Sequence, residues 1–311
     1  MTEFHHVSVL LNESIEALNI RPDGIYLDGT LGGAGHSSEI AKRLTTGLLI
    51  GVDRDPAALE AAKRRLEPWM DRVRLVHANF RELDDILDGL GIPAVDGMLF
   101  DLGVSSPQLD EAQRGFSYMA DAPLDMRMDP GDSLSAYEVV NDWPQEELRH
   151  ILFAYGEERY APLIAAAIVR RREQAPIQTT LELVDVIRSA MPQKALREKQ
   201  HPAKRSFQAI RIAVNDELGA VDAVMRSAIG RLKPGGRLAV ITFHSLEDRI
   251  VKNALAEAAK GCTCPPEFPV CVCGKKPTVR LISRKPIVSG EEELEQNPRA
   301  RSAKLRVAEK I

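Results

Sequence analysis

The stretch Tyr26-Leu27-Asp28-Gly29-Thr30-Leu31-Gly32-Gly33-Ala34-Gly35-His36-Ser37-Ser38 decides how the rest of the chain is interpreted. It begins as a short apolar, strand-favouring run that ends in an acid, continues through a cluster of glycines, and leads directly into a helical pattern. An open α/β sheet uses this succession of strand, glycine turn and helix to bring backbone N–H groups close to a ligand. The nearest match to a dinucleotide fingerprint, residues 33–38, lacks the third glycine. An NAD-binding site is therefore disfavoured.

Composition sets the class of protein before any motif is considered. The chain has 311 residues, of which 44% are hydrophobic and 28% charged, and its net charge is −4. No apolar run approaches the roughly 20 residues of a membrane helix, and residues 1–9 show no signal-peptide pattern. We therefore expect a cytoplasmic protein with no membrane contact. The sequence leaves the oligomeric state open.

Four further strands are predicted along the chain, and polar or aromatic residues follow several of them. Asp53 ends the second strand at the spacing from the glycine loop that suits a carboxylate bonded to ribose hydroxyls, although it could also cap the next helix. Phe80 follows the third strand and could lie flat on an adenine, with a core position as the alternative. Asp101 ends the fourth strand, so Asp28, Asp53, Phe80 and Asp101 are expected to line one crevice beyond the strand ends.

The regular alternation of strands and helices stops after the fourth strand. Residues 115–130 read as a polar, Met-rich loop, and three helical patterns follow at 144–155, 162–172 and 179–191, the last with a capping box. We predict a helical insertion at 111–205 in an α/β domain formed by 1–110 and 206–311. A helix from about 206 to 232, a fifth strand from 237 to 244 and a terminal hairpin at 278–283 and 302–308 complete the domain.

Basic residues gather near the end of the predicted insertion. Such a basic run is usually a solvated surface. Beside a cofactor crevice, however, contact with RNA phosphates is an equally good interpretation. The residues are Lys194, Arg197, Lys199, Lys204, Arg205 and Arg211, with Arg170, Arg171 and Arg172 as weaker candidates.

All four cysteines fall in one short segment, which excludes a disulfide framework spread over the fold. Cys262, Cys264, Cys271 and Cys273 provide enough thiolates for tetrahedral zinc, but their C-x-C spacing is less usual than C-x₂₋₄-C. The cysteines could bind a metal ion or remain reduced thiols in a loop. The sequence leaves both alternatives open, so no metal is assigned.

Several long motifs together resemble a known family. The Lys233-Pro234-Gly235-Gly236 turn before the fifth strand is typical of class I methyltransferases that use S-adenosylmethionine. More narrowly, the chain is similar to the MraW (RsmH) family from residue 5 to about residue 309. The motifs are 28–30 with 35–37, 101–110, 123–129, 201–205, 242–249 and 297–302.

The resemblance implies a Rossmann-like class I sheet with an all-helical insertion, and methylation of N4 of a decoding-region cytosine in 16S ribosomal RNA of the small subunit. S-adenosylmethionine is the implied cofactor. The residues implied to contact it are Ala34, Gly35, His36, Asp53, Phe80, Asp101 and Gln108. The roles of His36 and Gln108 rest on the resemblance alone, since a histidine at a helix start otherwise reads as a cap or packing residue.

Cytosine N4 is a poor nucleophile, because its lone pair is delocalised into the ring. The protein must align the amine with the methyl group and accept an amine proton. The Asn/Asp-Pro-Pro-aromatic motif of many amino-methyltransferases is absent after the fourth strand. We therefore assign catalysis to Asp101, Ser105 and His244. An ordinary Asp101 carboxyl, with a pKa near about 3.9, would be ionised at neutral pH.

The base must leave its stack to reach such a crevice, so Phe116 and Tyr118 are candidates for stacking, with burial as the alternative. A methyltransferase for another RNA or a small molecule is the nearest rival. A nicotinamide dehydrogenase and a non-catalytic RNA-binding module are more distant ones.

Overall fold

A mixed seven-stranded sheet organises most of the chain. The computed structural model describes residues 8–262, 264, 268–270 and 272–311. It divides into a sheet unit, residues 1–103 and 218–311, and a helical unit, residues 104–217. The insertion predicted at 111–205 thus differs at both ends from the helical unit, which starts earlier and ends later.

The strands of the sheet unit follow the order β3-β2-β1-β4-β5-β7-β6. Neighbours among β1 to β5 are parallel, whereas β7 runs antiparallel to both β5 and β6. The chain passes from β1 to β2 on one side and reaches β4 on the other, so the order reverses at β1, where open α/β sheets bind ligands. The strands are β1 (Ile25–Asp28), β2 (Leu48–Asp53), β3 (Val73–His77), β4 (Val95–Asp101), β5 (Leu232–Thr242), β6 (Val279–Leu281) and β7 (Lys304–Lys310).

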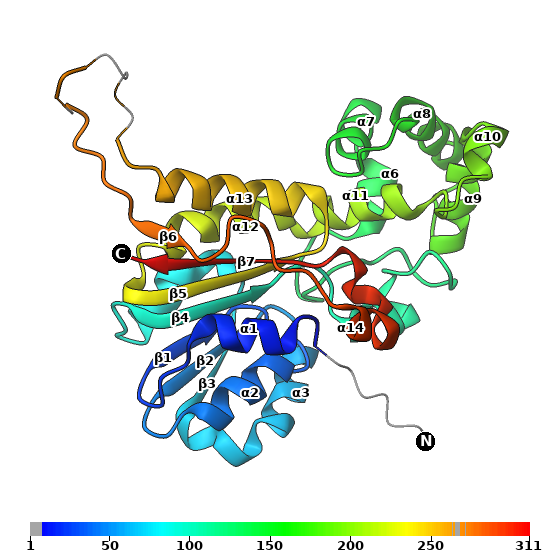
Figure 1. Ribbon diagram of the computed structural model, residues 1–311. Helices are drawn as coiled ribbons and strands as arrows, with labels where there is room; N and C mark the ends of the chain where they lie inside the picture. Colours follow the sequence, from blue (N-terminus) through cyan, green and yellow to red (C-terminus); the bar gives the residue numbers. More distant parts are fainter. Residues whose placement is uncertain (1–7, 263, 265–267, 271) are drawn as a thin grey trace. The chain divides into compact units, whose positions relative to one another are not determined.

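Helices cover both faces of this sheet (Figure 1). One apolar cluster joins the sheet to α1, α2 and α3, and another joins it to α4, α12 and α13. Strand β4 is buried from Val95 to Phe100 because both faces of the sheet are covered. The helices are α1 (Leu11–Leu18), α2 (Gly35–Arg43), α3 (Pro56–Arg65), α4 (Leu83–Gly89), α12 (Glu217–Ala228), α13 (Ser245–Ala259) and α14 (Glu291–Gln296), with 3₁₀ turns at Glu67–Arg72, Phe80–Glu82 and Pro298–Ser302.

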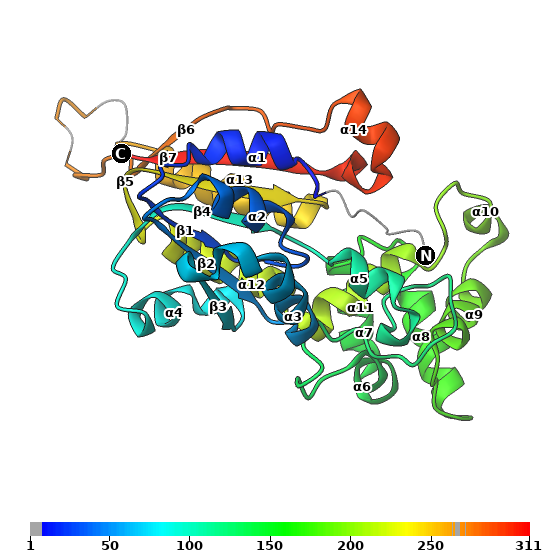
Figure 2. The same ribbon diagram turned by 90° about the horizontal axis from the view of Figure 1, so that it is seen from below.

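The helices of the helical unit are labelled in Figure 2. The unit has its own apolar core, which includes residues of the Met-rich loop. Met126 and Met128 are buried there, and the Asn215 side chain donates to the Met126 carbonyl at 2.7 Å and accepts from the Met128 N–H at 2.8 Å. The loop is therefore pinned to the last helix of the unit. Its helices are α5 (Ser106–Asp110), α6 (Ala136–Asp142), α7 (Gln145–Ala154), α8 (Ala161–Arg172), α9 (Thr180–Ala190), α10 (Gln193–Leu196) and α11 (Lys204–Asn215), with a 3₁₀ turn at Ala112–Arg114.

Most predicted elements are confirmed, including the capping box of Thr179 and Glu182 and the antiparallel terminal strands. The single helix predicted at 206–232 is wrong, because Asp216 adopts φ 45° and separates α11 from α12. The fifth strand also begins earlier than predicted, at Leu232, since residues 233–236 form an irregularity within β5. Helix α6 was not predicted, although Ser135 and Glu138 form its capping box.

Within the described residues, none of the helices combines the length and the apolar composition that a membrane span requires.

A methyl group added at Gly29 tests how tightly the turn after β1 is packed. Its Cβ would lie 2.3 Å from a ring carbon of the fully buried Phe100. We expect Gly29→Ala to lower the free energy of unfolding by about 1–3 kcal/mol, the usual cost of overpacking. At Gly33 a Cβ meets no atom within 4 Å, so Gly33→Ala is the matched control. Urea unfolding curves for the two variants that coincide would contradict this packing.

Candidate active site

The glycine loop between β1 and α2 has an unusual backbone. Gly32 and Ala34 both adopt left-handed conformations, with φ 47° and φ 57°. Such a conformation is uncommon for an alanine and is kept only where the surroundings enforce it. Gly35 begins α2, and a Cβ there would lie 1.8 Å from the Ser8 hydroxyl. The loop therefore holds its backbone N–H groups in a conformation set by close packing behind it.

Asp53, at the end of β2, is bonded to this loop. Its Oδ2 accepts from the Gly32 N–H at 2.8 Å, and its Oδ1 accepts from the Asp55 N–H at 2.8 Å. Asp55, and not Asp53, caps α3, since its side chain accepts from the Ala57 N–H at 3.0 Å. Burial raises the pKa of Asp53 from 3.8 to about 6. The alternative of Asp53 as a helix cap is thus excluded.

Asp28, at the end of β1, serves the loop from inside. Its side chain is buried, with Oδ2 accepting from the Ser37 hydroxyl at 2.7 Å and Oδ1 from the Thr30 N–H at 3.2 Å. Burial raises its pKa from 3.8 to about 6, and the nearby Asp53 carboxyl adds to the effect. Asp28 therefore fastens the turn to α2 and is not an exposed lining residue of the predicted crevice.

Asp101, at the end of β4, lies beside the same turn. Its N–H donates to Thr30 Oγ1 at 2.5 Å, and its Oδ2 is 3.9 Å from His36 Nδ1. Its Oδ1 is buried and has no hydrogen-bond partner among the described residues, while 24% of the whole side chain is exposed. Buried polar atoms are normally bonded, so an orphaned carboxylate oxygen at a strand end indicates a place for a ligand donor.

The prediction of an ordinary Asp101 pKa is wrong. Removal from water, together with the carboxyls of Asp28 and Glu247, raises the pKa of Asp101 well above its usual range. None of Asp28, Asp53 and Asp101 forms an ion pair with a lysine or arginine in the part of the chain that the structure describes. Each of the three acids therefore holds its proton more firmly than an ordinary carboxyl, with no lysine or arginine among the described residues paired to it.

His36 is buried at the start of α2. Its Nε2 lies 3.1 Å from the Val9 carbonyl. If Nε2 carries the proton for this bond, Nδ1 of the neutral ring faces the Asp101 carboxyl. The 3.9 Å between Nδ1 and Asp101 Oδ2 is too long for a hydrogen bond, so His36 packs the loop and its ring lies beside Asp101.

Phe80 begins the 3₁₀ turn after β3 and is partly buried. Its ring meets Phe100 edge to face, with centroids 5.8 Å apart. Part of the ring packs against the core and part remains accessible, so the two interpretations of this residue are compatible.

His244 follows β5 and precedes α13. Its Nε2 lies 3.0 Å from Glu247 Oε1. Glu247 is buried, and its Oε2 accepts from the N–H groups of Phe243 and His244 at 2.9 and 3.3 Å. Glu247 was not predicted as a site residue, although a glutamate three residues after a helix cap is a recognisable signal.

Ser105 and Gln108 lie in the helical unit and form a capping box on α5. The Ser105 N–H donates to Gln108 Oε1 at 3.0 Å, and the Gln108 N–H donates to the Ser105 hydroxyl at 3.4 Å. The two side chains therefore order the start of α5, and their roles in binding and catalysis stay predictions.

The two aromatic residues predicted as stacking candidates are both engaged within the helical unit. Phe116 is buried in its core, and Tyr118 stacks on His201 with centroids 4.6 Å apart. Burial is thus the better interpretation of Phe116.

The predicted basic stretch divides into engaged and exposed residues. Arg211 pairs with Glu217 at 2.8 Å, and Arg172 donates to the carbonyls of Val140 and Trp143. Exposed side chains remain at Lys194, Arg197, Lys199 and Lys204.

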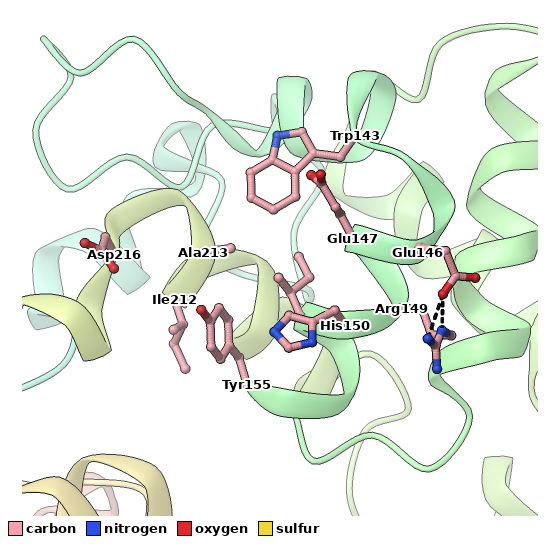
Figure 3. A pocket seen from close by; sticks show the side chains of 10 residues that line it. Trp143, Glu146, Glu147, Arg149, His150, Tyr155, Ile212, Ala213 and Asp216 are labelled. Carbon is pink, nitrogen blue, oxygen red and sulfur yellow. Dashed lines mark hydrogen bonds and ion pairs between the residues drawn. The ribbon is translucent and has the colours of Figure 1, made fainter.

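A cavity of about 410 Å³ lies in the helical unit between α7 and α11 (Figure 3). Trp143, His150 and Tyr155 provide aromatic walls, while Glu146 and Glu147 are among its acidic residues. It contains none of the predicted site residues, and its carboxylates would repel phosphate. We therefore place the candidate active site at the strand ends of the sheet unit.

The sheet order and the acidic site beside a glycine loop define the class of protein. A parallel sheet in this order, with an antiparallel strand next to the fifth, is the architecture of class I S-adenosylmethionine-dependent methyltransferases. The chain belongs to the MraW methylase family, whose model matches residues 3–311.

Curated relatives match over nearly the whole chain. A "Ribosomal RNA small subunit methyltransferase H" of Brevibacillus brevis is 60% identical over 309 residues, which is 99% of this chain and 98% of the relative. A protein of the same name from Heliobacterium mobile is 58% identical over 311 residues, covering 99% of this chain and all of the relative.

Asp28→Asn isolates the cost of a buried carboxyl, because an amide keeps both hydrogen bonds, accepting from Thr30 N–H and donating to Ser37 Oγ. The pKa of Asp28 is raised to about 6, so the folded protein holds the proton more firmly than the unfolded chain. The stabilisation that the protonated Asp28 carboxyl gives the wild type is therefore complete below about pH 4, and it is lost as the pH rises through about 6.

We expect Asp28→Asn to be more stable than the wild type at pH 7.5, by up to about 3 kcal/mol. The difference should shrink towards pH 4.5. Urea unfolding at the two pH values measures it, with Asp85→Asn, at an exposed carboxyl, as the control. An equal difference at both pH values would contradict the raised pKa.

Proposed function

We propose that this protein methylates N4 of a cytosine in the decoding region of 16S ribosomal RNA, in the cytoplasm, with S-adenosylmethionine as the methyl donor. Membership of the MraW methylase family supports the methyl transfer. The names of the relatives support the small-subunit ribosomal RNA as substrate. The single observation that carries the proposal is the gathering of acids from β1, β2 and β4 around one glycine loop.

The residues of this site fit a cationic nucleoside. Desolvation and mutual repulsion raise the pKa values of Asp28, Asp53 and Asp101, and a nearby positive charge would relieve both effects. S-adenosylmethionine carries a sulfonium and an ammonium group beside a ribose and an adenine. A site with acids, a glycine loop and a partly accessible aromatic ring provides a complement to each of these parts.

Each residue of the site then has a distinct binding task. The ionised Asp53 carboxylate accepts hydrogen bonds from ribose hydroxyls, as acids at this position do in nucleotide-binding sheets. The backbone of residues 32–35, including Ala34 and Gly35, approaches the donor closely because the loop carries few side chains. Phe80 presents its accessible ring to the adenine. The family resemblance adds Gln108 and His36 to the contacts proposed for the donor.

Bound S-adenosylmethionine supplies an activated methyl group, and the chain supplies alignment and a proton acceptor. In its ionised form Asp101 could accept a hydrogen bond from the cytosine amine at Oδ1, which has no hydrogen-bond partner among the described residues. A carboxyl with a raised pKa is also a better base for the proton that leaves nitrogen. His244, whose Nε2 lies 3.0 Å from Glu247 Oε1, is proposed as a further polar group for the amine, and the catalytic role of Ser105 stays a prediction from the sequence.

The exposed basic residues near α10 are proposed to contact the RNA backbone. Lys194, Arg197 and Lys199 are all exposed, and Glu198 between them pairs with Arg159 at 3.1 Å. The pair diverts the one acid of this segment, so the three cations can face phosphate.

Methyl transfer from labelled S-adenosylmethionine separates the proposal from its alternatives. Small ribosomal subunits that lack this methyl group should accept label at cytosine N4, whereas free cytidine and other small molecules should not. Label on another RNA, or on free nucleosides alone, would overturn the assignment of the substrate. Binding of NAD in place of S-adenosylmethionine would overturn the assignment of the cofactor.

Asp101→Asn tests the proposed proton acceptor. We expect turnover to fall by about 10²–10⁴-fold, the usual contribution of a general base, while affinity for S-adenosylmethionine falls much less. Calorimetric binding and single-turnover methyl transfer measure the two effects separately. Glu60→Gln, at an exposed site on α3, is the control. Unchanged turnover would remove Asp101 from the mechanism.

Neutralising the basic segment tests the RNA contact. The variant with Lys194→Gln, Arg197→Gln and Lys199→Gln should bind small subunits more weakly, and the logarithm of its affinity should fall less steeply with the logarithm of salt concentration. Each lost phosphate contact to a single strand lowers that slope by about 0.7. The control carries Lys63→Gln and Arg64→Gln, both exposed on α3. Equal slopes for the two variants would exclude contact through this segment.

A further inference from the structure

The segment between α13 and β6, residues 260–278, contains a cluster of cysteines outside the proposed active site. Figure 1 shows the chain running away from the sheet after α13 and returning to it at β6. Cys262, Cys264 and Cys273 are described, whereas Cys271 lies outside the described residues. The Sγ atoms of the three described cysteines lie within 4.8 Å of one another.

The spacing of these sulfurs is that of thiolates around one metal ion. The Sγ atoms of Cys262 and Cys273 are 3.7 Å apart. A tetrahedral Zn²⁺ with bonds of about 2.3 Å places its sulfur ligands about 3.8 Å from each other. A disulfide requires about 2.05 Å. The separation therefore matches two ligands of a common ion and not a covalent bond.

Backbone N–H groups point at the same sulfurs. The Cys264 N–H donates to Cys262 Sγ at 3.4 Å, and the Val272 N–H donates to Cys264 Sγ at 3.3 Å. Such donors stabilise negative charge on sulfur, which is the form that binds metal. Gly274 follows the last cysteine with φ 62°, so the backbone can turn sharply directly after the ligand.

The described residues near the cysteine cluster make few packing contacts that could order the segment. Val270 and Val272 are 70% and 72% exposed, so neither side chain packs into a core. The segment contacts α13 near β6, where Lys275 pairs with Glu257 and the Thr278 N–H donates to the Ala258 carbonyl. Long segments without secondary structure are uncommon in ordered domains, and a metal cross-link offsets the entropy of closing one.

We propose that Cys262, Cys264 and Cys273 bind a structural Zn²⁺ that cross-links residues 260–278. Zinc is the metal that thiolate-rich tetrahedral sites select in the absence of redox chemistry. The three thiols lose their protons on binding, and the fourth position of the tetrahedron is filled by another donor. This site is independent of the proposed methyl transfer, since the active-site acids take no part in it.

Metal content of the full chain, purified without a histidine tag, tests the proposal. We expect about one zinc per chain by plasma mass spectrometry, and loss of at least nine-tenths of it in the variant with Cys262→Ser, Cys264→Ser and Cys273→Ser. Val270→Ser, in the same segment, is the matched control and should keep its zinc. Wild-type protein that holds no zinc after incubation with zinc sulfate, or a triple variant that retains it, would overturn the proposal.

Two further readouts separate metal binding from general damage to the fold. Replacement by Co²⁺ should produce the absorption of tetrahedral cobalt with thiolate ligands in the wild type and in Val270→Ser, and not in the triple variant. Chelation should speed tryptic cleavage after Lys260 and Lys275 in the wild type by tenfold or more, with no change in the triple variant. If zinc-loaded wild type is cleaved at the same rate with and without the chelator, the ion does not order this segment.

Discussion

The hydrogen bond from the Gly32 N–H to the Asp53 carboxylate connects the glycine loop to the neighbouring strand. Parallel pairing places the carboxyl ends of β1, β2 and β4 at one edge of the sheet, and the loop after β1 has to cross that edge. Asp28 fixes the loop to α2, and Thr30 fixes it to the backbone of β4. The shape of the site thus follows from polar contacts between segments that lie far apart in sequence.

This arrangement concentrates carboxyls that form no ion pair with a lysine or arginine of the described residues. Their pKa values are raised first by removal from water and second by neighbouring carboxyls, so the ionised forms are disfavoured in the fold. Catalytic sites commonly retain such unfavourable charge because it is compensated only when the correct ligand arrives. A positively charged methyl donor is such a ligand, so selectivity against neutral nucleosides follows from the same electrostatics.

Local patterns predicted most strands and helices, because buried parallel strands such as β2 and β4 are short apolar runs ending in an acid. They also predicted that Asp53, Phe80 and Asp101 line one site, because each lies at or just after the end of a strand. They could not reveal the break at Asp216, since a left-handed aspartate leaves no clear mark in an otherwise helical sequence. The raised pKa of Asp101 was equally hidden, because it depends on burial and on the carboxyls of Asp28 and Glu247, all of which come from the tertiary fold.

Strand β7 lies between β5 and β6 although it is the last strand of the chain. Until residues 304–310 have been synthesised, β5 exposes a row of unsatisfied N–H and C=O groups along an apolar strand. Such an open edge can pair with strands of other molecules. Completion of the sheet must therefore wait for the carboxyl-terminal residues to leave the ribosome, and nascent chains pass through a stage at which aggregation competes with folding.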